Sequence, residues 1–227
     1  IYHSLSFYQT SNQQFLDLKR VLVVGYGSIG KRHVKNLLLN KSIKVIIVTK
    51  QKNLLNNSRI KIVNNLDDGI KENPDIAFVT NETRFHVPVA IKLAKNGIHL
   101  FIEKPLSDSL NKINTLQKIV KNKKLVTMVG CNFRFFPSIS KIKKLVEQNK
   151  IGKVISVQIE SGSYLPDWHP YEDYRKGYAA RKDLGGGVTL TQIHEIDYLK
   201  WFFGNPIEVC SLSGKFSNLQ LDVDDYC

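Results

Sequence analysis

The sequence predicts an α/β protein in which a doubly wound parallel sheet is followed by an incomplete α+β domain with an open sheet. Three observations support this fold class. Apolar strand-like segments alternate with helical segments from residue 21 to residue 130, as in sheets covered by helices on both faces. A glycine-rich turn joins the first strand to the first helix. The alternation stops at Pro137, where a differently patterned segment begins.

The first strand, turn and helix carry the strongest local signal. Residues 21–30 read VLVVGYGSIG, which places G-x-G-x-x-G at Gly25, Gly27 and Gly30 directly before the helical stretch KRHVKNLLLN. A dinucleotide-binding fingerprint requires this strand–turn–helix setting. Gly25 allows the tight turn, Gly27 lets a pyrophosphate approach, and Gly30 lets helix and strand pack closely. The helix N-terminus can then hold phosphates through its free N–H groups. The alternative is a glycine turn between any strand and helix.

Five further strands would complete a Rossmann sheet. The helix after the fourth strand covers residues 85–97 and is closed by Gly97. The helix after the fifth strand is expected to be capped by Ser107 and to run to about Lys121. The five strands are expected at residues 43–50, 59–63, 74–80, 97–105 and 124–130.

After Pro137 the elements are less regular. Pro137 suits the first turn of a helix that ends before Gly152. Residues 165–183 have almost no periodicity but many aromatic and charged residues, which favours a functional segment over a disordered one. Further elements are expected as a strand over 153–164, a helix over 188–204 and a strand over 207–216. We therefore divide the chain into an extension of unknown role (1–18), a Rossmann NAD(P)-binding domain (19–136) and a C-terminal α+β substrate domain (137–227).

Composition narrows the class of protein. The net charge is +13, but 26 of the 33 cations are lysines scattered over the whole chain, which indicates compositional bias rather than a nucleic-acid surface. No apolar run approaches the roughly 20 residues that span a bilayer, and the start is not a signal peptide. Cys131, Cys210 and Cys227 are far apart and read as reduced thiols. We expect a cytoplasmic protein without nucleic-acid or membrane partners.

Two clusters contain candidate catalytic groups. Lys104, in Glu103-Lys104-Pro105, follows the fifth strand at the sheet edge where ligands bind. Burial or a nearby charge can lower the pKa of such a lysine and fit it for proton transfer, whereas most lysines are surface groups. His194 follows three glycines and shares a helix face with Asp197, three residues on. A core histidine and a solvated aspartate are the alternatives.

These residues together resemble the Gfo/Idh/MocA family (glucose–fructose oxidoreductase and inositol dehydrogenase) of nicotinamide-dependent oxidoreductases. The resemblance covers roughly residues 19–227. Residues 164–187 are similar to a branch of the family associated with surface-sugar or sialic-acid-type biosynthesis. The motifs that carry the resemblance are GYGSIG (25–30), NETRFH (81–86), FIEKPLS (101–107), VGCNFRFFPS (129–138) and GGGVTLTQIHEIDYLKWFFG (185–204).

The resemblance implies a mechanism. Lys104 and His194 would face the substrate beside the nicotinamide, one of them taking a proton while hydride passes to the cofactor. We assign His194 as the acid/base because its ordinary pKa is nearest neutrality, and Lys104 as the group that orients the oxygen; the reverse remains open. Many members of the family carry an Asp four residues before the histidine, where this chain has Leu190. The interval between the three glycines and His194 is also one residue shorter than in the family. Tyr178 is a third catalytic candidate, with a packing tyrosine as its alternative.

The end of the second strand bears on the cofactor. An acidic residue there would bind the ribose of NAD, but this chain has Thr49 and Lys50, a hydroxyl followed by a cation, which suits the 2′-phosphate of NADP. NADP is therefore favoured over NAD, and no metal is expected. The candidate cofactor-binding residues are Gly25, Gly27, Ser28, Ile29, Gly30, Thr49, Lys50, Thr80, Asn81, His86, Glu103, Lys104 and Asn132.

The predicted function is hydride transfer between the nicotinamide and a hydroxyl of a sugar, nucleotide sugar or cyclitol. A non-catalytic NAD(P)-binding sensor or regulator of the same fold is the alternative, which Leu190 and the short C-terminal region favour. A dehydrogenase for a small non-sugar substrate is a third possibility. Relatives dimerise through a large open sheet in the second domain, so we expect a homo-oligomer if that sheet is complete.

Overall fold

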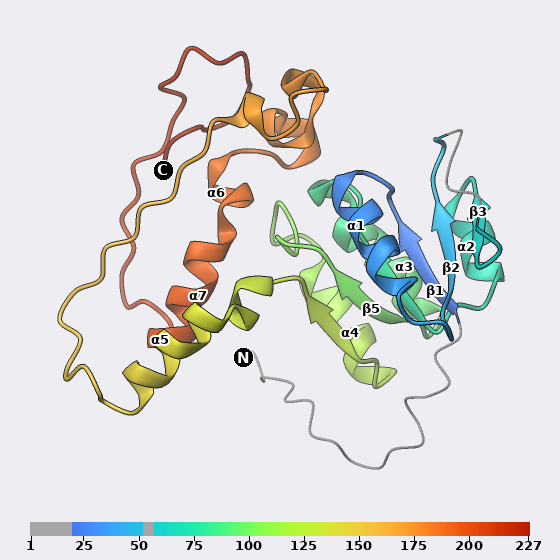
Figure 1. The fold of residues 1–227 in the computed structure, drawn as a ribbon, viewed down its shortest axis with the longest axis horizontal. Coiled ribbons are helices and arrows are strands. Elements are labelled where there is room, and N and C mark those ends of the chain that lie inside the picture. The colour runs from blue at the N-terminus through green and yellow to red at the C-terminus, as the bar shows by residue number, and fades with distance from the viewer. Residues whose placement is uncertain (1–19, 52–56) are drawn as a thin grey trace. The chain divides into compact units, whose positions relative to one another are not determined.

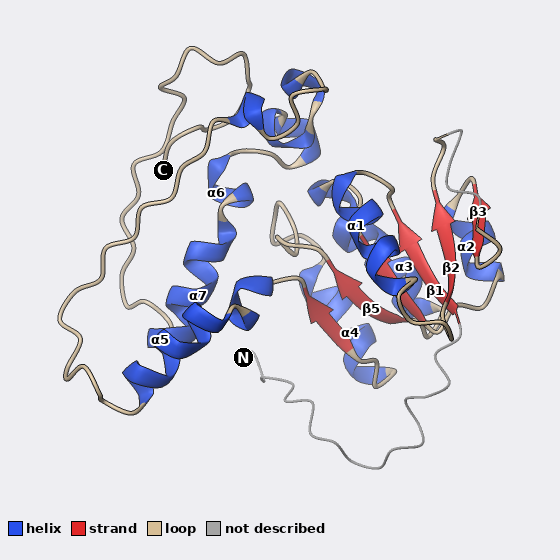
Figure 2. Ribbon diagram, viewed as in Figure 1, coloured by secondary structure: helices blue, strands red, loops and turns tan. Residues whose placement is uncertain are grey.

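The computed structural model describes residues 20–51 and 57–227. Its six strands form one sheet in the order β3-β2-β1-β4-β5-β6 (Figure 2). The pairs β1·β2, β2·β3 and β5·β6 are parallel, and the ends of the first two strands are level because Val24 pairs with Val48. The doubly wound Rossmann sheet is thereby confirmed. Its strands are β1 (Arg20–Val24), β2 (Lys44–Val48), β3 (Ile60–Val63), β4 (Ile76–Val79), β5 (His99–Ile102) and β6 (Thr127–Val129).

Helices alternate with these strands along the chain (Figure 1). The side chain of Asn65 caps α2 by accepting a hydrogen bond from the N–H of Asp68, at 2.9 Å. The α-helices of this region are α1 (Ser28–Leu37), α2 (Leu66–Lys71), α3 (His86–Lys95) and α4 (Ile113–Asn122).

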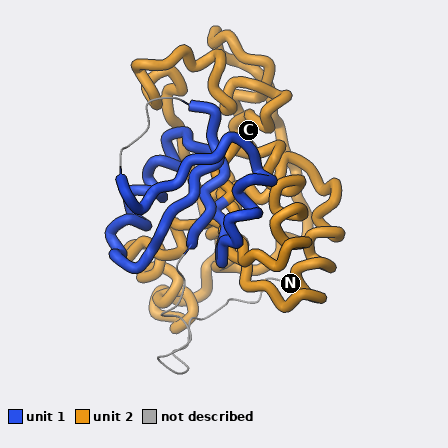
Figure 3. Tube along the Cα trace, turned by 90° about the vertical axis from the view of Figure 1, so that its right-hand side faces the viewer, with its two compact units in different colours: residues 1–78 blue, residues 79–227 orange. Residues whose placement is uncertain are grey.

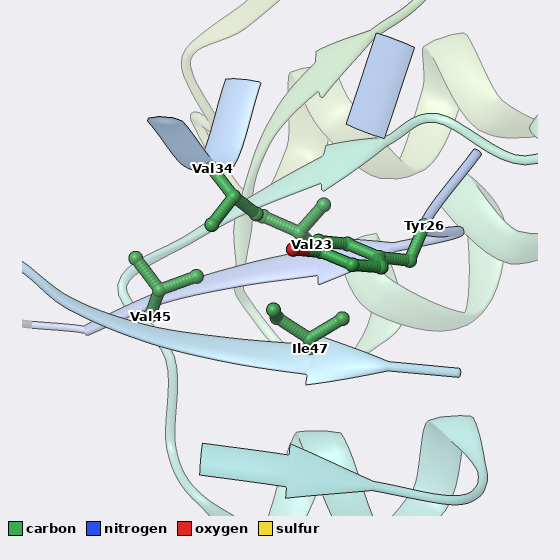
Figure 4. Packing of buried hydrophobic residues seen from close by; sticks show 5 residues of the cluster. All are labelled: Val23, Tyr26, Val34, Val45 and Ile47. Atoms are coloured by element: carbon green, nitrogen blue, oxygen red, sulfur yellow. The ribbon is translucent and has the colours of Figure 1, made fainter. Parts of the chain in front are cut away.

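The core beside α1 explains why the first strands form. Val23, Tyr26, Val34, Val45 and Ile47, each at most 5 % exposed, pack together from β1, the glycine turn, α1 and β2 (Figure 4). Strands of a parallel sheet are buried on both faces and therefore read as continuous apolar runs. Full burial of each aliphatic side chain contributes about 1.5–3 kcal/mol, so the runs in β1 and β2 specify these strands locally.

Contacts divide the chain into two compact units, residues 1–78 and 79–227 (Figure 3). The second unit contains α5 (Pro137–Glu147), which has Pro137 in its first turn as predicted. Residues 165–184 form four short 3-10 turns, consistent with their lack of periodicity. The remaining helical elements of this unit are η2 (Thr83–Phe85), η3 (Asn132–Phe135), η4 (Leu165–Asp167), η5 (Tyr174–Lys176), η6 (Tyr178–Ala180), η7 (Lys182–Leu184), α6 (Val188–Thr191) and α7 (Ile193–Phe203).

Two helix predictions were wrong in detail. Ser107 does not cap α4, which begins at Ile113 after Lys112 in a left-handed conformation (φ 61°). The Ser107 hydroxyl instead accepts a hydrogen bond from the N–H of Ser109, at 3.3 Å, and so closes a local turn. The helix expected over 188–204 is divided into α6 and α7 at Gln192, whose ψ of 32° departs from helical geometry.

The two strands predicted after Pro137 are not formed. Residues 153–164 and 207–216 run as extended or irregular chain, and Ile155 is 94 % exposed. A strand is stabilised by a hydrogen-bonded neighbour, and within the described ranges these segments have one antiparallel bridge, between Gly214 and Tyr226. Alternation of apolar and polar residues alone was therefore not enough to predict a strand.

No described helix has the length and apolar character of a membrane span.

Candidate active site

The turn after β1 is open to a ligand. Gly25 has φ +100°, a conformation that favours glycine. A Cβ placed on Gly27 would meet nothing within 4 Å, so protein packing does not demand glycine there and the space beside the backbone stays free. No side chain caps α1 and no acidic residue lies in its first turn. The N–H groups of Ser28, Ile29 and Gly30 therefore lie at a helix N-terminus suited to phosphate, which fits a dinucleotide.

The segment after β2 is tied to this turn. Gln51, which sequence reasoning missed, donates from Nε2 to the carbonyl of Tyr26 at 3.1 Å, and its N–H donates to the hydroxyl of Thr49 at 3.1 Å. The exposed Lys50 lies between them. The sequence contains no Asp or Glu from residue 18 to residue 66. This stretch therefore contains no carboxylate that could bind a ribose hydroxyl. Gln51 could have been recognised as a site residue from its position just after the end of the second strand.

His86 connects the segments that follow β4 and β5. It is 1 % exposed, its Nδ1 lies 2.8 Å from the carbonyl oxygen of Pro105 and its Nε2 lies 2.8 Å from that of Asn81. Burial lowers the pKa of His86. Both nitrogens face backbone carbonyls, so His86 positions these loops and has no ring nitrogen left for the cofactor contact that was predicted. Thr80, 4 % exposed, precedes Asn81, whose buried Oδ1 has no hydrogen-bond partner among the described residues.

Lys104 is half-buried and held by backbone. Its Nζ donates to the carbonyl oxygen of Thr191 at 2.9 Å, and its N–H donates to Oε2 of Glu103 at 3.1 Å. Burial lowers the pKa of Lys104, while the negative charges of Glu103 and Glu195 act in the opposite direction. The lysine is thus anchored beside the end of α6.

His194 lies in the first turn of α7 and stacks on Phe133, with ring centroids 4.2 Å apart and planes 4° apart. Burial lowers the pKa of His194, and the positive charge of Lys104 lowers it further. Its Nδ1 is buried and has no hydrogen-bond partner in the described part of the chain. The structure thus brings Lys104 and His194 into one electrostatic environment, with a ring nitrogen left for a ligand.

Tyr178 also borders this centre. Burial raises the pKa of Tyr178, and the negative charge of Glu103 raises it further, so the hydroxyl stays protonated at neutral pH. The Glu103 carboxylate is itself closely packed, since a Cβ on Gly130 would lie 3.1 Å from its Oε2. Asn132 begins η3 just beyond, and its N–H donates to the carbonyl of Gly130 at 2.8 Å.

Asp197 is engaged by Arg134, a residue that sequence reasoning missed. Nε and Nη2 of Arg134 donate to the two carboxylate oxygens at 2.7 and 2.6 Å, joining η3 to α7. Asp197 lies on α7 with His194, and both of its carboxylate oxygens accept hydrogen bonds from the arginine. Burial of the Cys131 thiol, together with the nearby negative charge of Asp197, raises its pKa to about 12. In the sequence, the arginine between Phe133 and Phe135 was the feature that could have suggested an ion pair here.

The glycine-rich turn is held by Asp224. The N–H and hydroxyl of Thr189 donate to Oδ2 of Asp224 at 3.1 and 2.6 Å, and the N–H of Val188 donates to the Asp224 carbonyl at 2.9 Å. Gly187, with φ +102°, would place a Cβ against the same carboxylate. Leu190 lines a cavity of about 760 Å³ between this turn and residues 213–224. Asp224 could not be predicted as a partner of this turn, because the two segments are 35 residues apart in the sequence.

Known families match both parts of the chain. Residues 19–131 match an oxidoreductase family with an NAD-binding Rossmann fold, the Gfo/Idh/MocA family, and residues 139–227 match the C-terminal domain of the same family. The solved structure of myo-inositol 2-dehydrogenase from Lactobacillus plantarum is similar, with a TM-score of 0.72 and 26 % identity, over 82 % of this chain and 56 % of that one.

Two curated relatives show the same likeness in sequence. Levoglucosan dehydrogenase of Pseudarthrobacter phenanthrenivorans is 32 % identical over 139 residues, which are 60 % of this chain and 35 % of the relative. Myo-inositol 2-dehydrogenase of Thermotoga maritima is 28 % identical over 199 residues, 83 % of this chain and 56 % of the relative. The chain thus spans about a third to a little over half of these relatives. It belongs to the Gfo/Idh/MocA family of oxidoreductases with an NAD-binding Rossmann fold.

Proposed function

We propose that this chain carries the cofactor-binding and catalytic residues of an NAD(P)-dependent dehydrogenase acting on a hydroxyl of a sugar, nucleotide sugar or cyclitol. The observation that carries the proposal is that Lys104 Nζ is anchored at 2.9 Å on the carbonyl of Thr191, three residues before His194, whose Nδ1 has no partner among the described residues. Both groups are half-buried, and the pKa of each is lowered. A surface lysine and a satisfied core histidine would not be coupled in this way. The relatives named as levoglucosan and inositol dehydrogenases support the substrate class.

The residues divide the chemistry among them. A nicotinamide held at the glycine turn would supply the hydride acceptor for the carbinol carbon. His194 is neutral at pH 7 because its pKa lies below 6.5, so its unpartnered Nδ1 accepts the hydroxyl proton. Lys104 keeps one N–H on the carbonyl of Thr191 and offers its remaining donors to the substrate oxygen. Tyr178, protonated at neutral pH, is a further donor.

Turnover of a substrate panel tests this function. Formation of reduced nicotinamide is followed with myo-inositol, scyllo-inositol, levoglucosan and nucleotide sugars. We expect Lys104→Met and His194→Asn each to lower kcat at least about 100-fold, since positioned acid–base groups contribute about 10²–10⁴-fold. The exposed Lys95→Met is the matched control. If both Lys104→Met and His194→Asn retain full turnover, the assignment of these two residues as catalytic groups is wrong.

For the cofactor, we propose a preference for NADP. Thr49 and Lys50 follow β2, and the absence of acidic residues from 18 to 66 leaves no carboxylate to repel a 2′-phosphate. Fluorescence titration with NADPH and NADH tests the preference. Lys50→Ala should weaken NADPH about tenfold or more and leave NADH unchanged, because a hydrogen bond to a charged group contributes about 1.5–3 kcal/mol. Lys95→Ala is the control, and tighter binding of NADH by the unaltered chain would reverse the preference.

A cofactor-binding sensor or regulator is the second candidate, favoured by Leu190 at the position where the resemblance implies Asp. Binding of NADPH with no turnover of any panel substrate would support it. A homo-oligomer and a cytoplasmic location stay predictions; sedimentation and fractionation test them.

A further inference from the structure

Glu195 is a half-buried acid that the assignments above do not use. It follows His194 directly in the first turn of α7, and its Oε2 is buried without a hydrogen-bond partner among the described residues. A buried carboxylate oxygen without a partner is destabilising. Its cost is offset when a positive charge or a donor lies within reach. The groups around Glu195 show which charge that is.

Glu195 lies four residues after Thr191, whose carbonyl oxygen accepts the hydrogen bond from Lys104 Nζ at 2.9 Å, and directly after His194. Its negative charge accordingly raises the pKa values of Lys104, His194 and Tyr198. His194 also responds to Asp197 and Glu103, and Lys104 to Glu103 and Cys131. Asp197 is held by the two hydrogen bonds from Arg134. Among these acids, Glu195 therefore combines an unpartnered oxygen with an effect on both candidate catalytic groups.

The proposed reaction makes a demand on this centre. Oxidation of the alcohol breaks the C–H bond, whose electron pair leaves with hydride for the nicotinamide, and breaks the O–H bond, whose proton goes to Nδ1 of His194 while the C=O bond forms. The imidazolium then lies beside the Lys104 ammonium. Two like charges in a half-buried site repel each other far more than in water. A nearby carboxylate offsets that repulsion.

We propose that Glu195 is this carboxylate, and that it stabilises the proton transferred to His194 next to Lys104. Glu195 is then a positioning residue that acts through His194 and does not touch the substrate. The inference rests on the proposed function. It also accounts for Leu190, since the negative charge that the resemblance implies before the histidine is supplied one residue after it.

An NMR titration of the His194 ring tests the inference without any substrate, with the ring signal assigned by its loss in His194→Asn. Glu195→Gln removes the charge at nearly constant volume and should lower the pKa of His194 by about one unit, the low end of the 1–3 units by which a nearby opposite charge shifts a pKa. Glu195→Asp should restore most of the shift. Glu208→Gln, on an exposed glutamate, is the matched control and should leave the pKa unchanged.

Kinetics give a second readout on the same variants. In Glu195→Gln the acid limb of the kcat profile should move to lower pH and kcat should fall about tenfold, with KM changed less than twofold. If Glu195→Gln does not fold, Glu195→Ser removes the same charge and is titrated instead. An unchanged His194 pKa overturns the inference even in an active enzyme. An unaltered chain without turnover overturns the proposed function, and the titration still decides the role of Glu195.

Discussion

Burial changes the acid–base properties of Lys104 and His194 from those of the free side chains. Burial lowers the pKa of each, and the charge of Lys104 lowers that of His194 further. The sequence predicted both residues because each stands at a fixed place in a short motif. It missed Arg134 and Asp224, because their hydrogen-bond partners lie on other elements and only the folded chain brings them together. It missed Glu195 because the burial of its carboxylate oxygen depends on the folded chain.

At the same scale, the three thiols should differ in reactivity. Cys210 and Cys227 are exposed, whereas burial and Asp197 raise the pKa of Cys131 to about 12. Because the thiolate is the reactive species, a disulfide reagent at pH 8 should modify two thiols rapidly and the third only after denaturation. Cys131→Ser should leave the rapid count at two. Rapid modification of all three thiols in the folded chain would contradict the burial of Cys131.

Secondary-structure elements were predictable where burial is local. Strands β1 and β2 read as continuous apolar runs because their central residues are buried on both faces of the sheet. Pro137 marks the start of α5 through its own geometry. The start of α4 and the segments 153–164 and 207–216 depend on partners instead. The hydroxyl of Ser107 accepts a hydrogen bond within a local turn and does not cap the helix. Within the described residues, the two alternating segments have no neighbouring strand to pair with.

Two glycine substitutions should separate folding from cofactor binding. A Cβ at Gly27 meets nothing within 4 Å and its φ of −74° suits any residue, so Gly27→Ala should change the thermal midpoint by less than a few degrees. The methyl group occupies the approach to the backbone, however, and NADPH affinity should fall at least about tenfold. Gly162→Ala, also in open space, is the control. Retained affinity in Gly27→Ala would exclude the turn as the phosphate site.

The connection between η3 and α7 should be measurable as a coupling energy. The Arg134–Asp197 pair has two hydrogen bonds, and the two side chains are only 25 % and 15 % exposed. Arg134→Met should lower the free energy of unfolding by about 2 kcal/mol, because Asp197 is left half-buried and unpaired. A double-mutant cycle with Asp197→Asn, measured by urea unfolding, should give about 1–2 kcal/mol of interaction. Additive losses would contradict a specific pair.

The whole molecule binds protons differently when folded. The pKa values of His86 and His194 are lowered below 6.5 by burial, so the unfolded chain binds more protons than the folded chain near pH 6. The stability that these residues contribute is therefore fully present above about pH 6.5 and is lost as the pH falls below it. Lys104 acts in the same direction, but only in alkaline solution.

We therefore expect the free energy of unfolding to fall by about 1–3 kcal/mol between pH 7.5 and pH 5.5, since one unit of pKa difference corresponds to about 1.4 kcal/mol. Urea unfolding at several pH values gives the slope. His194→Asn should reduce the slope without abolishing it, because His86 remains. A stability that is constant over this interval would show that neither ring resists protonation in the folded chain.

The anchor of Lys104 has a consequence for mutational tolerance. Its acceptor is the backbone carbonyl of Thr191, at the last residue of α6 and directly before the break at Gln192. Exchange of the side chain at position 191 leaves that oxygen in place. A deletion or insertion in the Gly187–His194 interval moves it. Thr191 is buried, so in a saturation library the small side chains at position 191 (Ser, Ala, Val, Cys) should keep the lysine anchored. Single-residue length variants of this interval should lose the anchor, whatever residues they contain.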